Sequence, residues 1–168
     1  MKQIDKDIKV VKITTKEDCT QCNLLLEKLI NFESAFDELI IKGSKISNFY
    51  ENTLGKDNTV IFCAKDKEQI VGYVMAYGSK SHTHSMPQVN VMSIFVDEAY
   101  RHSHIGSKLL NSVENWATKE FGECVLELTC YNENKNALDF YKRKGFSPLL
   151  VKMRKHCSAE SKAKSNKE

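Results

Sequence analysis

Residues 96–110 read Val-Asp-Glu-Ala-Tyr-Arg-His-Ser-His-Ile-Gly-Ser-Lys-Leu-Leu, and the hydrophobic pattern changes period within this stretch. A strand-like apolar run ends at Val96, whereas from Ile105 onward apolar residues recur every three or four positions, as in an amphipathic helix. The sequence therefore predicts a strand, a polar turn and a helix. The first backbone N–H groups of such a helix lack intrahelical partners and attract anions.

This turn has two features that suit a phosphate or pyrophosphate group. Arg101 places a fixed positive charge beside the amides of residues 101–106, and Gly106 lets a ligand approach the backbone closely. The alternative is an ordinary strand-to-helix turn that carries a solvated arginine. The turn alone leaves both interpretations open.

Further strand and helix patterns lie on either side of the turn. Thr14 and Glu17 form a capping-box signature, and the apolar positions that follow predict one helix, or two in series, up to Gly43. Elsewhere we expect strands at 8–13, 59–64, 69–77, 88–96, 124–130 and 146–153, and helices at 105–121, 134–144 and, as a short one, around 47–53. This order predicts a mixed sheet covered by helices, which is a three-layer α/β sandwich.

Composition limits the class of protein. The chain has 168 residues, a net charge of +3 and 41% hydrophobic residues, which suits one domain, placed here at residues 1–157. Residues 158–168 have almost nothing to bury, so we expect a disordered tail. Scattered basic residues argue against a nucleic acid partner. Without a membrane-length apolar run or a secretory signal at the N-terminus, we expect a cytoplasmic protein with no membrane partner.

The cysteines fit that compartment. All six stand in helix or strand patterns, without the dense spacing of a disulfide scaffold, so we expect reduced thiols. Cys19 and Cys22 form one CxxC with no second pair, whereas a closed zinc site needs four ligands. We interpret both as buried thiols, with metal or redox chemistry as the alternative.

A second informative stretch, residues 132–146, reads Asn-Glu-Asn-Lys-Asn-Ala-Leu-Asp-Phe-Tyr-Lys-Arg-Lys-Gly-Phe. Together the two stretches resemble the GCN5-related N-acetyltransferase (GNAT) superfamily, and the resemblance covers about residues 8–154. The family's acetyl-CoA loop, Val-x-x-x-Tyr-Arg-x-x-Gly-x-Gly-x-x-Leu-Leu, is matched at Val96, Tyr100, Arg101, Gly106, Leu109 and Leu110. Its later motif, Asn-x-x-Ala-x-x-x-Tyr-x-x-x-Gly-Phe, is matched at Asn134, Ala137, Tyr141, Gly145 and Phe146.

One position departs from the family pattern. His104 stands where the family most often has the first glycine of Arg-x-x-Gly-x-Gly. A side chain there costs free energy if the turn needs a positive φ, although histidine tolerates that conformation better than most residues. The imidazole would either narrow the pyrophosphate pocket or lie near the phosphates.

The resemblance implies an acyl-CoA N-acyltransferase fold, a three-layer α/β/α sandwich with a mixed, largely antiparallel central sheet. It implies an enzyme that uses acetyl-CoA as co-substrate and needs no metal. The strand at 94–96 would splay from its neighbour, so that its backbone pairs with the pantetheine arm, while the following loop holds the pyrophosphate. The implied cofactor-binding residues are Ile94, Phe95, Val96, Arg101, His102, Ser103, His104, Ile105, Gly106, Ser107 and Asn134.

The implied reaction is direct transfer of an acetyl group to a primary amine in a ternary complex. A backbone amide of the central strand would stabilise the oxyanion, and Tyr141, the implied catalytic residue, would donate a proton to the departing thiolate. Each motif residue also has a structural alternative. Tyr141 could instead pack on Phe146 in a Schellman ending at Gly145, and Asn134 could be a helix N-cap.

The general base is not singled out by the sequence. The candidates are Glu33, Asp37, Asn90, Ser93 and Glu127. The pair His82 and His84 could be metal ligands, but two loop imidazoles are more often solvent-exposed. Cys130 is interpreted as a small core residue and not as a nucleophile.

The acceptor is expected to be a small-molecule or peptide amine. A homodimer is left open as the assembly. Two alternatives to catalysis also stay open: a non-catalytic acyl-CoA-binding or regulatory domain on the same fold, and a plain interaction domain.

Overall fold

The computed structural model describes residues 8–157. Within that range the elements are, in order, β1 (Lys9–Lys12), α1 (Lys16–Glu33), β2 (Thr59–Asp66), β3 (Gln69–Ser79), β4 (Gln88–Val96), a 3₁₀ turn η1 (Glu98–Tyr100), α2 (Ile105–Phe121), β5 (Val125–Leu128) and α3 (Lys135–Arg143). Residues 8–135 form one unit and residues 136–157 another.

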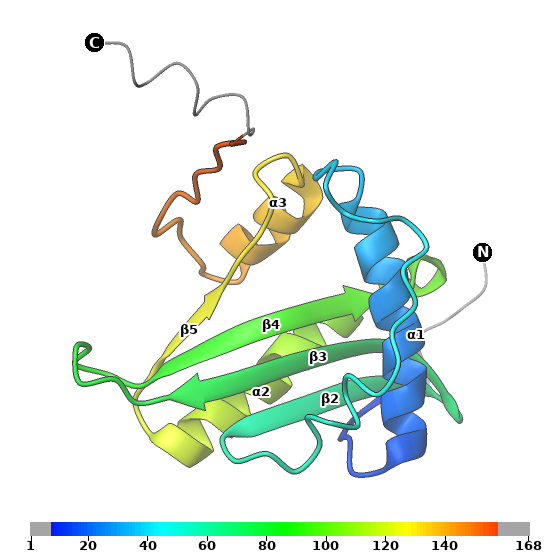
Figure 1. Ribbon diagram of the computed structural model, residues 1–168. Helices are drawn as coiled ribbons and strands as arrows, with labels where there is room; N and C mark the ends of the chain where they lie inside the picture. The colour runs from blue at the N-terminus through cyan, green and yellow to red at the C-terminus, as the bar shows by residue number, and fades with distance from the viewer. Residues whose placement is uncertain (1–7, 158–168) are drawn as a thin grey trace, which may run out of the picture. The chain divides into compact units, whose positions relative to one another are not determined.

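The sheet of the first unit has the order β1-β2-β3-β4-β5, with antiparallel pairs except for the parallel pair β4–β5. Two parallel strands need a crossover, and α2 supplies it. Helix α1 covers one face of the sheet and α2 the other (Figure 1). The predicted three-layer α/β/α sandwich with a mixed, largely antiparallel sheet is confirmed.

Apolar side chains are buried on both faces of the sheet. The helical residues Leu109, Leu110 and Val113 of α2 are fully buried, as the periodicity predicted. On the other side, the core contains Cys19, Cys22, Leu25, Tyr50, Ile61, Cys63, Tyr73, Met75 and Phe95. The predicted bounds of α2 are confirmed, because its apolar period is regular and Gly122 ends it with a φ of +73°.

The CxxC cysteines are buried free thiols, as predicted. Burial raises the pKa of Cys19 to about 11 and that of Cys22 further still, so both stay protonated at neutral pH. A protonated, buried thiol is a poor nucleophile, and these residues act as small core side chains. The start of the helix that carries them differs from the prediction by one residue, because Thr15 and not Thr14 is the N-cap, accepting from the Asp18 N–H at 3.2 Å.

The helical pattern after residue 33 is not realised, and this part of the prediction is wrong. Residues 34–58 form turns, and no helix occurs at 47–53. The buried Asp37 carboxylate accepts the Leu39 N–H at 3.0 Å, and the Asn31 side chain accepts the Gly43 N–H at 2.9 Å. Such local side-chain bonds offer the backbone an alternative to helix, so the apolar residues Leu39 and Ile41 are exposed.

The predicted last strand is also wrong. Residues 146–157 form neither helix nor strand, and Leu149, Leu150, Val151 and Met153 are exposed. An apolar run becomes a strand only where a neighbouring strand supplies hydrogen bonds, which the run itself cannot specify. The expectations for residues 1–7 and 158–168 lie outside the described residues. Within the described range no helix is long and apolar enough to cross a membrane.

Candidate acyl-CoA site

Strand β4 contains a bulge and then loses its parallel neighbour. Ser93 pairs with Met75 and Val91 with Ala76, so Met92 is an extra residue on β4. Pairing with β5 covers only residues 88–91. Figure 1 shows the two strands diverging beyond this point. The splay that the resemblance implied is therefore present, on the C-terminal half of β4.

Backbone groups at Ile94 and Val96 face this opening. The Asp97 N–H donates to the Val71 carbonyl of β3 at 2.9 Å. Because N–H and C=O groups alternate in direction along a strand, those of Ile94 and Val96 point away from β3, toward the side where β5 has diverged. Between them, the Phe95 side chain is buried in the α1-side core.

The loop after β4 is fastened to two other elements. The Asp97 carboxylate pairs with Lys28 of α1 at 2.5 Å, and the Tyr100 hydroxyl donates to Asp66, the last residue of β2, at 2.9 Å. The Ser103 hydroxyl donates to the Tyr100 carbonyl. These contacts explain the tyrosine of the motif, which anchors the loop to the sheet.

The start of α2 leaves backbone amides without helical acceptors. The first intrahelical bond runs from the Lys108 N–H to the His104 carbonyl at 3.0 Å, and no side chain caps the helix at His104. The amides of residues 105–107 thus lack helical acceptors, which overlaps only in part with the predicted anion-binding amides of residues 101–106, since the Arg101 N–H donates to the Glu98 carbonyl at 3.2 Å. His102 and His104 have φ values of +66° and +59°, so the position where the family has glycine is left-handed here as well.

The Arg101 side chain folds back from this turn. Its guanidinium lies 5.2 Å from the ring centroid of Phe32 and 5.6 Å from that of Phe95, and its Nε donates to the Val96 carbonyl at 3.2 Å. This geometry is typical of cation–π stacking. The arginine therefore links the loop to α1 and β4, a contact that its spacing in the sequence did not indicate.

Asn134 and Tyr141 belong to different units. Asn134 directly precedes α3, the position of an N-cap, and its N–H donates to the Tyr131 carbonyl at 3.0 Å. Within the second unit, the Phe146 N–H donates to the Tyr141 carbonyl and the Gly145 N–H to the Lys142 carbonyl, each at 3.0 Å. With Gly145 at a φ of +87° and the Tyr141 and Phe146 ring centroids 5.8 Å apart, this is the Schellman ending that the sequence offered as an alternative.

Two buried tyrosines beside the bulge were missed by sequence reasoning. The Tyr50 hydroxyl lies 2.9 Å from the Ser93 hydroxyl, and the Tyr50 and Tyr73 ring centroids are 5.2 Å apart. Burial raises the pKa of both tyrosines, so both are neutral. The Tyr73 hydroxyl is the one buried side-chain polar atom in residues 8–157 without a hydrogen-bond partner. No local pattern identifies these residues, because the turn and the strand that carry them meet only in the folded chain.

The five candidate bases differ in their surroundings. Asp37 accepts from the Leu39 N–H and from the Tyr131 hydroxyl, and Glu127 accepts from Gln88 at 3.3 Å. Ser93 is bonded to Tyr50. Asn90 lies opposite Glu127, in the paired half of β4. Glu33, the last residue of α1, is half-buried.

The loop histidines lie in the segment between β3 and β4. His82 and His84 are exposed, and His84 Nδ1 lies 3.1 Å from the Thr83 hydroxyl. Across the described residues, no three His, Cys, Asp or Glu side chains are grouped so as to hold a metal ion. Cys130 is half-buried, and burial, followed by the nearby Glu33, raises its pKa.

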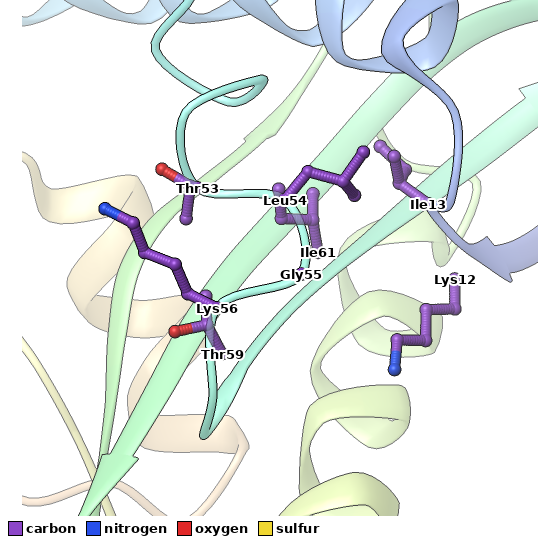
Figure 2. Close-up of a pocket in the computed structure, with 8 residues that line it drawn as sticks. All are labelled: Lys12, Ile13, Thr53, Leu54, Gly55, Lys56, Thr59 and Ile61. Carbon is purple, nitrogen blue, oxygen red and sulfur yellow. The ribbon is translucent and has the colours of Figure 1, made fainter.

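A separate pocket of about 160 Å³ lies at the other edge of the sheet (Figure 2). It is lined by Lys12, Ile13, Thr53, Leu54, Gly55, Lys56, Thr59 and Ile61, from the β1 and β2 side. None of these residues was predicted to bind acetyl-CoA. The pocket is therefore distinct from the opening beside β4.

The fold and the β4 opening define an acyl-CoA N-acyltransferase architecture. The chain matches the model of the acetyltransferase (GNAT) family over residues 26–146, and it belongs to this family. An uncharacterized N-acetyltransferase of Methanocaldococcus jannaschii is 30% identical over 143 residues, which cover 84% of this chain and 62% of that protein. The chain thus spans less than two thirds of that relative's length.

Solved structures share the fold at low sequence identity. The aminoglycoside acetyltransferase meta-AAC0020 from an uncultured soil metagenomic sample, in complex with trehalose, matches with a TM-score of 0.71 and 20% identity, covering 93% of this chain and 100% of that one. The structure of AAC(6')-Iy with a CoA-containing bisubstrate analog matches with a TM-score of 0.69 and 18% identity, covering 90% and 100%. At these identities the likeness concerns the fold.

Proposed function

We propose that the protein is an acetyl-CoA-dependent N-acetyltransferase that transfers the acetyl group to a primary amine by direct attack in a ternary complex. The observation that carries this proposal is the bulged β4, whose Ile94 and Val96 backbone groups face the side that β5 has left. An extended ligand arm can add there as a further strand would. Family membership supports the acyl chemistry.

The residues present fit acetyl-CoA, which would supply the thioester acyl group. Ile94, Phe95 and Val96 would bind the pantetheine arm. The amides and side chains at 101–107 would bind the pyrophosphate, since the start of α2 offers uncapped N–H groups. We propose that Arg101 holds the loop against β4 through its stacking on Phe32 and Phe95, besides adding positive charge there. Asn134 would contact the pantetheine side.

For the chemical step, we propose two roles within the chain. A β4 backbone amide donates to the oxyanion that develops when the amine nitrogen attacks the thioester carbonyl. Tyr141 protonates the departing thiolate. The support for this role is that Tyr141 occupies the tyrosine position of the family motif. No acyl-enzyme is needed, and no cysteine among the described residues acts as a nucleophile in this mechanism.

The proposed acceptor is a small-molecule or peptide amine. This proposal is supported by the fold shared with aminoglycoside acetyltransferases, whose substrates are small molecules. A non-catalytic acyl-CoA-binding domain is the second candidate, and the left-handed His104, where the family has glycine, is the observation that favours it.

Two measurements test the proposal. Acetyl-CoA at a hundred times its dissociation constant should stabilise the fold by about 2.7 kcal/mol, so an unchanged melting temperature at millimolar acetyl-CoA would exclude both CoA-binding candidates. Release of free CoA thiol is then followed with polyamines, aminoglycosides, amino acids and peptide N-termini. Turnover with one of these classes supports the enzyme, whereas binding without turnover on every class supports the non-catalytic candidate.

A further inference from the structure

The Glu33 carboxylate lies at the end of α1 with little water and no partner. Over residues 8–157 it accepts no hydrogen bond and forms no ion pair, although it is half-buried. The other partly buried carboxylates near this face are each bonded: Glu27 to Lys45, Glu51 to Asn23, and Asp37 to the Leu39 N–H. A half-buried carboxylate without a donor costs folding free energy, and such groups are concentrated at functional sites.

The neighbours of Glu33 place it over the open half of β4. Helix α1, whose last residue is Glu33, packs on β3 and β4, and Phe95 of β4 lies in the α1-side core. Burial first, and the Glu33 charge after it, raise the pKa values of Tyr73 on β3 and of Cys130 after β5, which agrees with this placement. The Ser93 hydroxyl, next to the bulge, is on this same face, where it contacts Tyr50.

Contacts around Glu33 bring the end of α1 against the segment after β5. The Phe36 ring stacks on Tyr131 with centroids 5.9 Å apart, and the Tyr131 hydroxyl donates to Asp37 at 3.4 Å. The Arg101 guanidinium lies over the ring of Phe32, the residue that precedes Glu33. Glu33 is thus held on the last turn of α1, between this aromatic contact and the start of the acyl-CoA loop.

Resting on the proposed function, we infer that Glu33 is the general base that removes a proton from the acceptor ammonium group. One ammonium proton passes to the carboxylate, and the freed nitrogen lone pair forms the N–C bond to the thioester carbonyl carbon. The C–S bond then breaks as Tyr141 gives its proton to the departing sulfur, the second proton of the nitrogen passes through water to the Tyr141 oxygen, and the Glu33 carboxyl releases the first proton to solvent. The net products are the amide, the CoA thiol and one released proton.

The other four candidate bases fit this role less well. Asp37 accepts hydrogen bonds at both carboxylate oxygens and Glu127 accepts one from Gln88, whereas Asn90 does not titrate. The Ser93 hydroxyl is bonded to Tyr50 and would need a base of its own. Glu33 alone among the five combines an unbonded carboxylate with a place on the α1 side of the opening.

Burial raises the pKa of Glu33 toward neutral pH, and the higher pKa makes the carboxylate a stronger base. The titratable groups that face it are Tyr73 of β3, Cys130 after β5 and, one turn on, Asp37. Tyr73 and Cys130 are neutral at pH 7 because burial raises their own pKa values. Glu33 therefore changes charge without a compensating group beside it.

The kinetic test compares Glu33→Gln with Glu38→Gln, which removes an exposed carboxylate five residues further on. On a working amine, Glu33→Gln should lower kcat by about 10²-fold or more, leave the KM for acetyl-CoA unchanged and remove the acidic limb of the kcat/KM profile. Glu38→Gln should match the wild type. A Glu33→Gln enzyme with wild-type kcat and pH profile would overturn the inference.

A second readout stays informative if no amine is turned over. The ¹³C resonance of the Glu33 carboxyl, assigned by its loss in Glu33→Gln, is titrated in the CoA-saturated wild type with and without spermine or kanamycin. The expected result is an apparent pKa above the ordinary glutamate value that falls when either polycation binds, since a cation stabilises the carboxylate. An ordinary pKa that neither amine shifts overturns the role of Glu33. If no amine is turned over although the Glu33 pKa is raised and falls on amine binding as expected, the proposed function is contradicted instead.

The melting temperature of Glu33→Gln provides a third test, because the direction of its change from the wild type is predicted. A folded pKa above the unfolded value means that the contribution of Glu33 to stability is present at low pH and is lost as pH rises through the folded pKa. Glu33→Gln should therefore melt at a higher temperature than the wild type at pH 7, and the difference should vanish near pH 4. A lower melting temperature of Glu33→Gln at pH 7 would show a structural carboxylate and overturn the inference.

Discussion

His104 is the position at which the acetyl-CoA loop of this chain departs from the family motif. Its φ of +59° lies in the left-handed region that glycine adopts without a steric penalty. The imidazole is exposed, directly before the uncapped amides of α2. A side chain at this position therefore affects both the stability of the turn and the room for a pyrophosphate group.

We predict that His104→Gly raises stability and tightens acetyl-CoA binding. Removing the left-handed strain contributes about 1–2 kcal/mol, and the greater freedom of glycine in the unfolded chain offsets about 0.5–1 kcal/mol of it. Asn58→Gly, at an exposed loop residue with a φ of +55°, is the control and should leave the affinity unchanged. Calorimetry of both variants measures the affinity. Weaker binding by His104→Gly would show that the imidazole assists the ligand, and equal binding would show that it does not obstruct the site; either result contradicts the prediction.

Of the two roles that the sequence allowed for Tyr141, the structural one is observed and the catalytic one remains a proposal. Its ring packs on Phe146 in the Schellman ending, and its hydroxyl is the proposed proton donor. Tyr141→Phe keeps the ring, so the melting temperature should change little while kcat falls by about 10²-fold at unchanged KM for acetyl-CoA. Tyr77→Phe, at a partly exposed strand residue, is the control. Full turnover by Tyr141→Phe, under conditions where chemistry limits the rate, would remove the proton-donor role.

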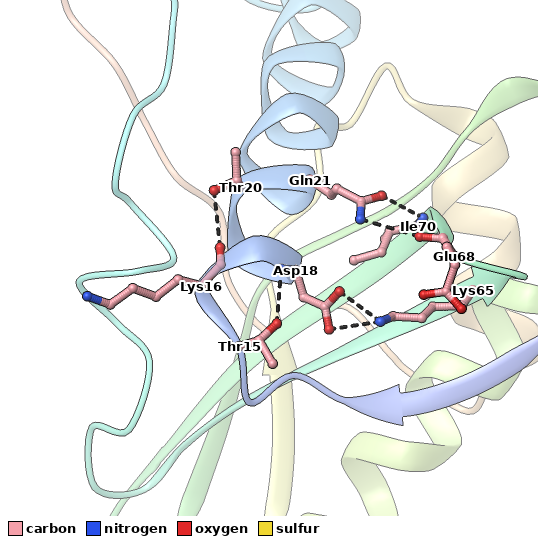
Figure 3. A network of polar contacts seen from close by, with 8 residues as sticks. All are labelled: Thr15, Lys16, Asp18, Thr20, Gln21, Lys65, Glu68 and Ile70. Atoms are coloured by element: carbon pink, nitrogen blue, oxygen red, sulfur yellow. Dashed lines mark hydrogen bonds and ion pairs between the residues drawn. The ribbon is translucent and has the colours of Figure 1, made fainter.

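Helix α1 is joined to the sheet by an ion pair near its N-terminus (Figure 3). Lys65 Nζ of β2 lies 2.7 and 2.9 Å from the two carboxylate oxygens of Asp18, and the side chains are 22% and 14% exposed. Gln21, one turn on, accepts from the Ile70 N–H at 3.0 Å. These contacts hold the N-terminal end of α1 on the sheet. Glu33 lies at the other end of the same helix.

We predict that Asp18→Asn lowers the free energy of unfolding by about 1–3 kcal/mol, between the values for exposed and buried pairs. Asp18 raises the pKa of Lys65, so the stability gained from Lys65 is complete below its ordinary pKa and is lost as pH rises through the folded value. The difference between Asp18→Asn and wild type should therefore shrink above pH 10. Urea unfolding at pH 7 and pH 11 tests this, with Asp57→Asn as an exposed control, and a pH-independent difference would exclude the ion pair as its cause.

The elements also show what the sequence can and cannot predict. The bounds of β4 and α2 follow from the sequence because their patterns are long and regular. The turns at 34–58 do not, because Asp37 and Asn31 bond to the local backbone, and the apolar run at 146–153 has no strand. Within the site, the motif located the loop at 101–107, whereas the bulge at Met92 depends on the pairing register with β3. Tyr50, in the turns, contacts Tyr73 and Ser93 only through tertiary packing, which no local pattern specifies.

At the scale of the whole first unit, one parallel strand pair explains where the site lies. Because β4 and β5 are parallel, the chain must cross over the sheet between them, and α2 therefore starts at the C-terminal end of β4. The uncapped amides of α2 and the open half of β4 are then found at the same end of the sheet. An anion and an extended arm of one ligand can be bound together there.

The measurement that tests this site most directly is amide hydrogen exchange of β4, followed by NMR with and without acetyl-CoA. The Ile94 and Val96 amides should exchange more slowly when acetyl-CoA is bound, since both point toward the opening. The Asp97 amide, already bonded to Val71 at 2.9 Å, should change little and serves as the internal control. Unchanged exchange at Ile94 and Val96 in the presence of saturating acetyl-CoA would contradict an acyl-CoA site on this strand.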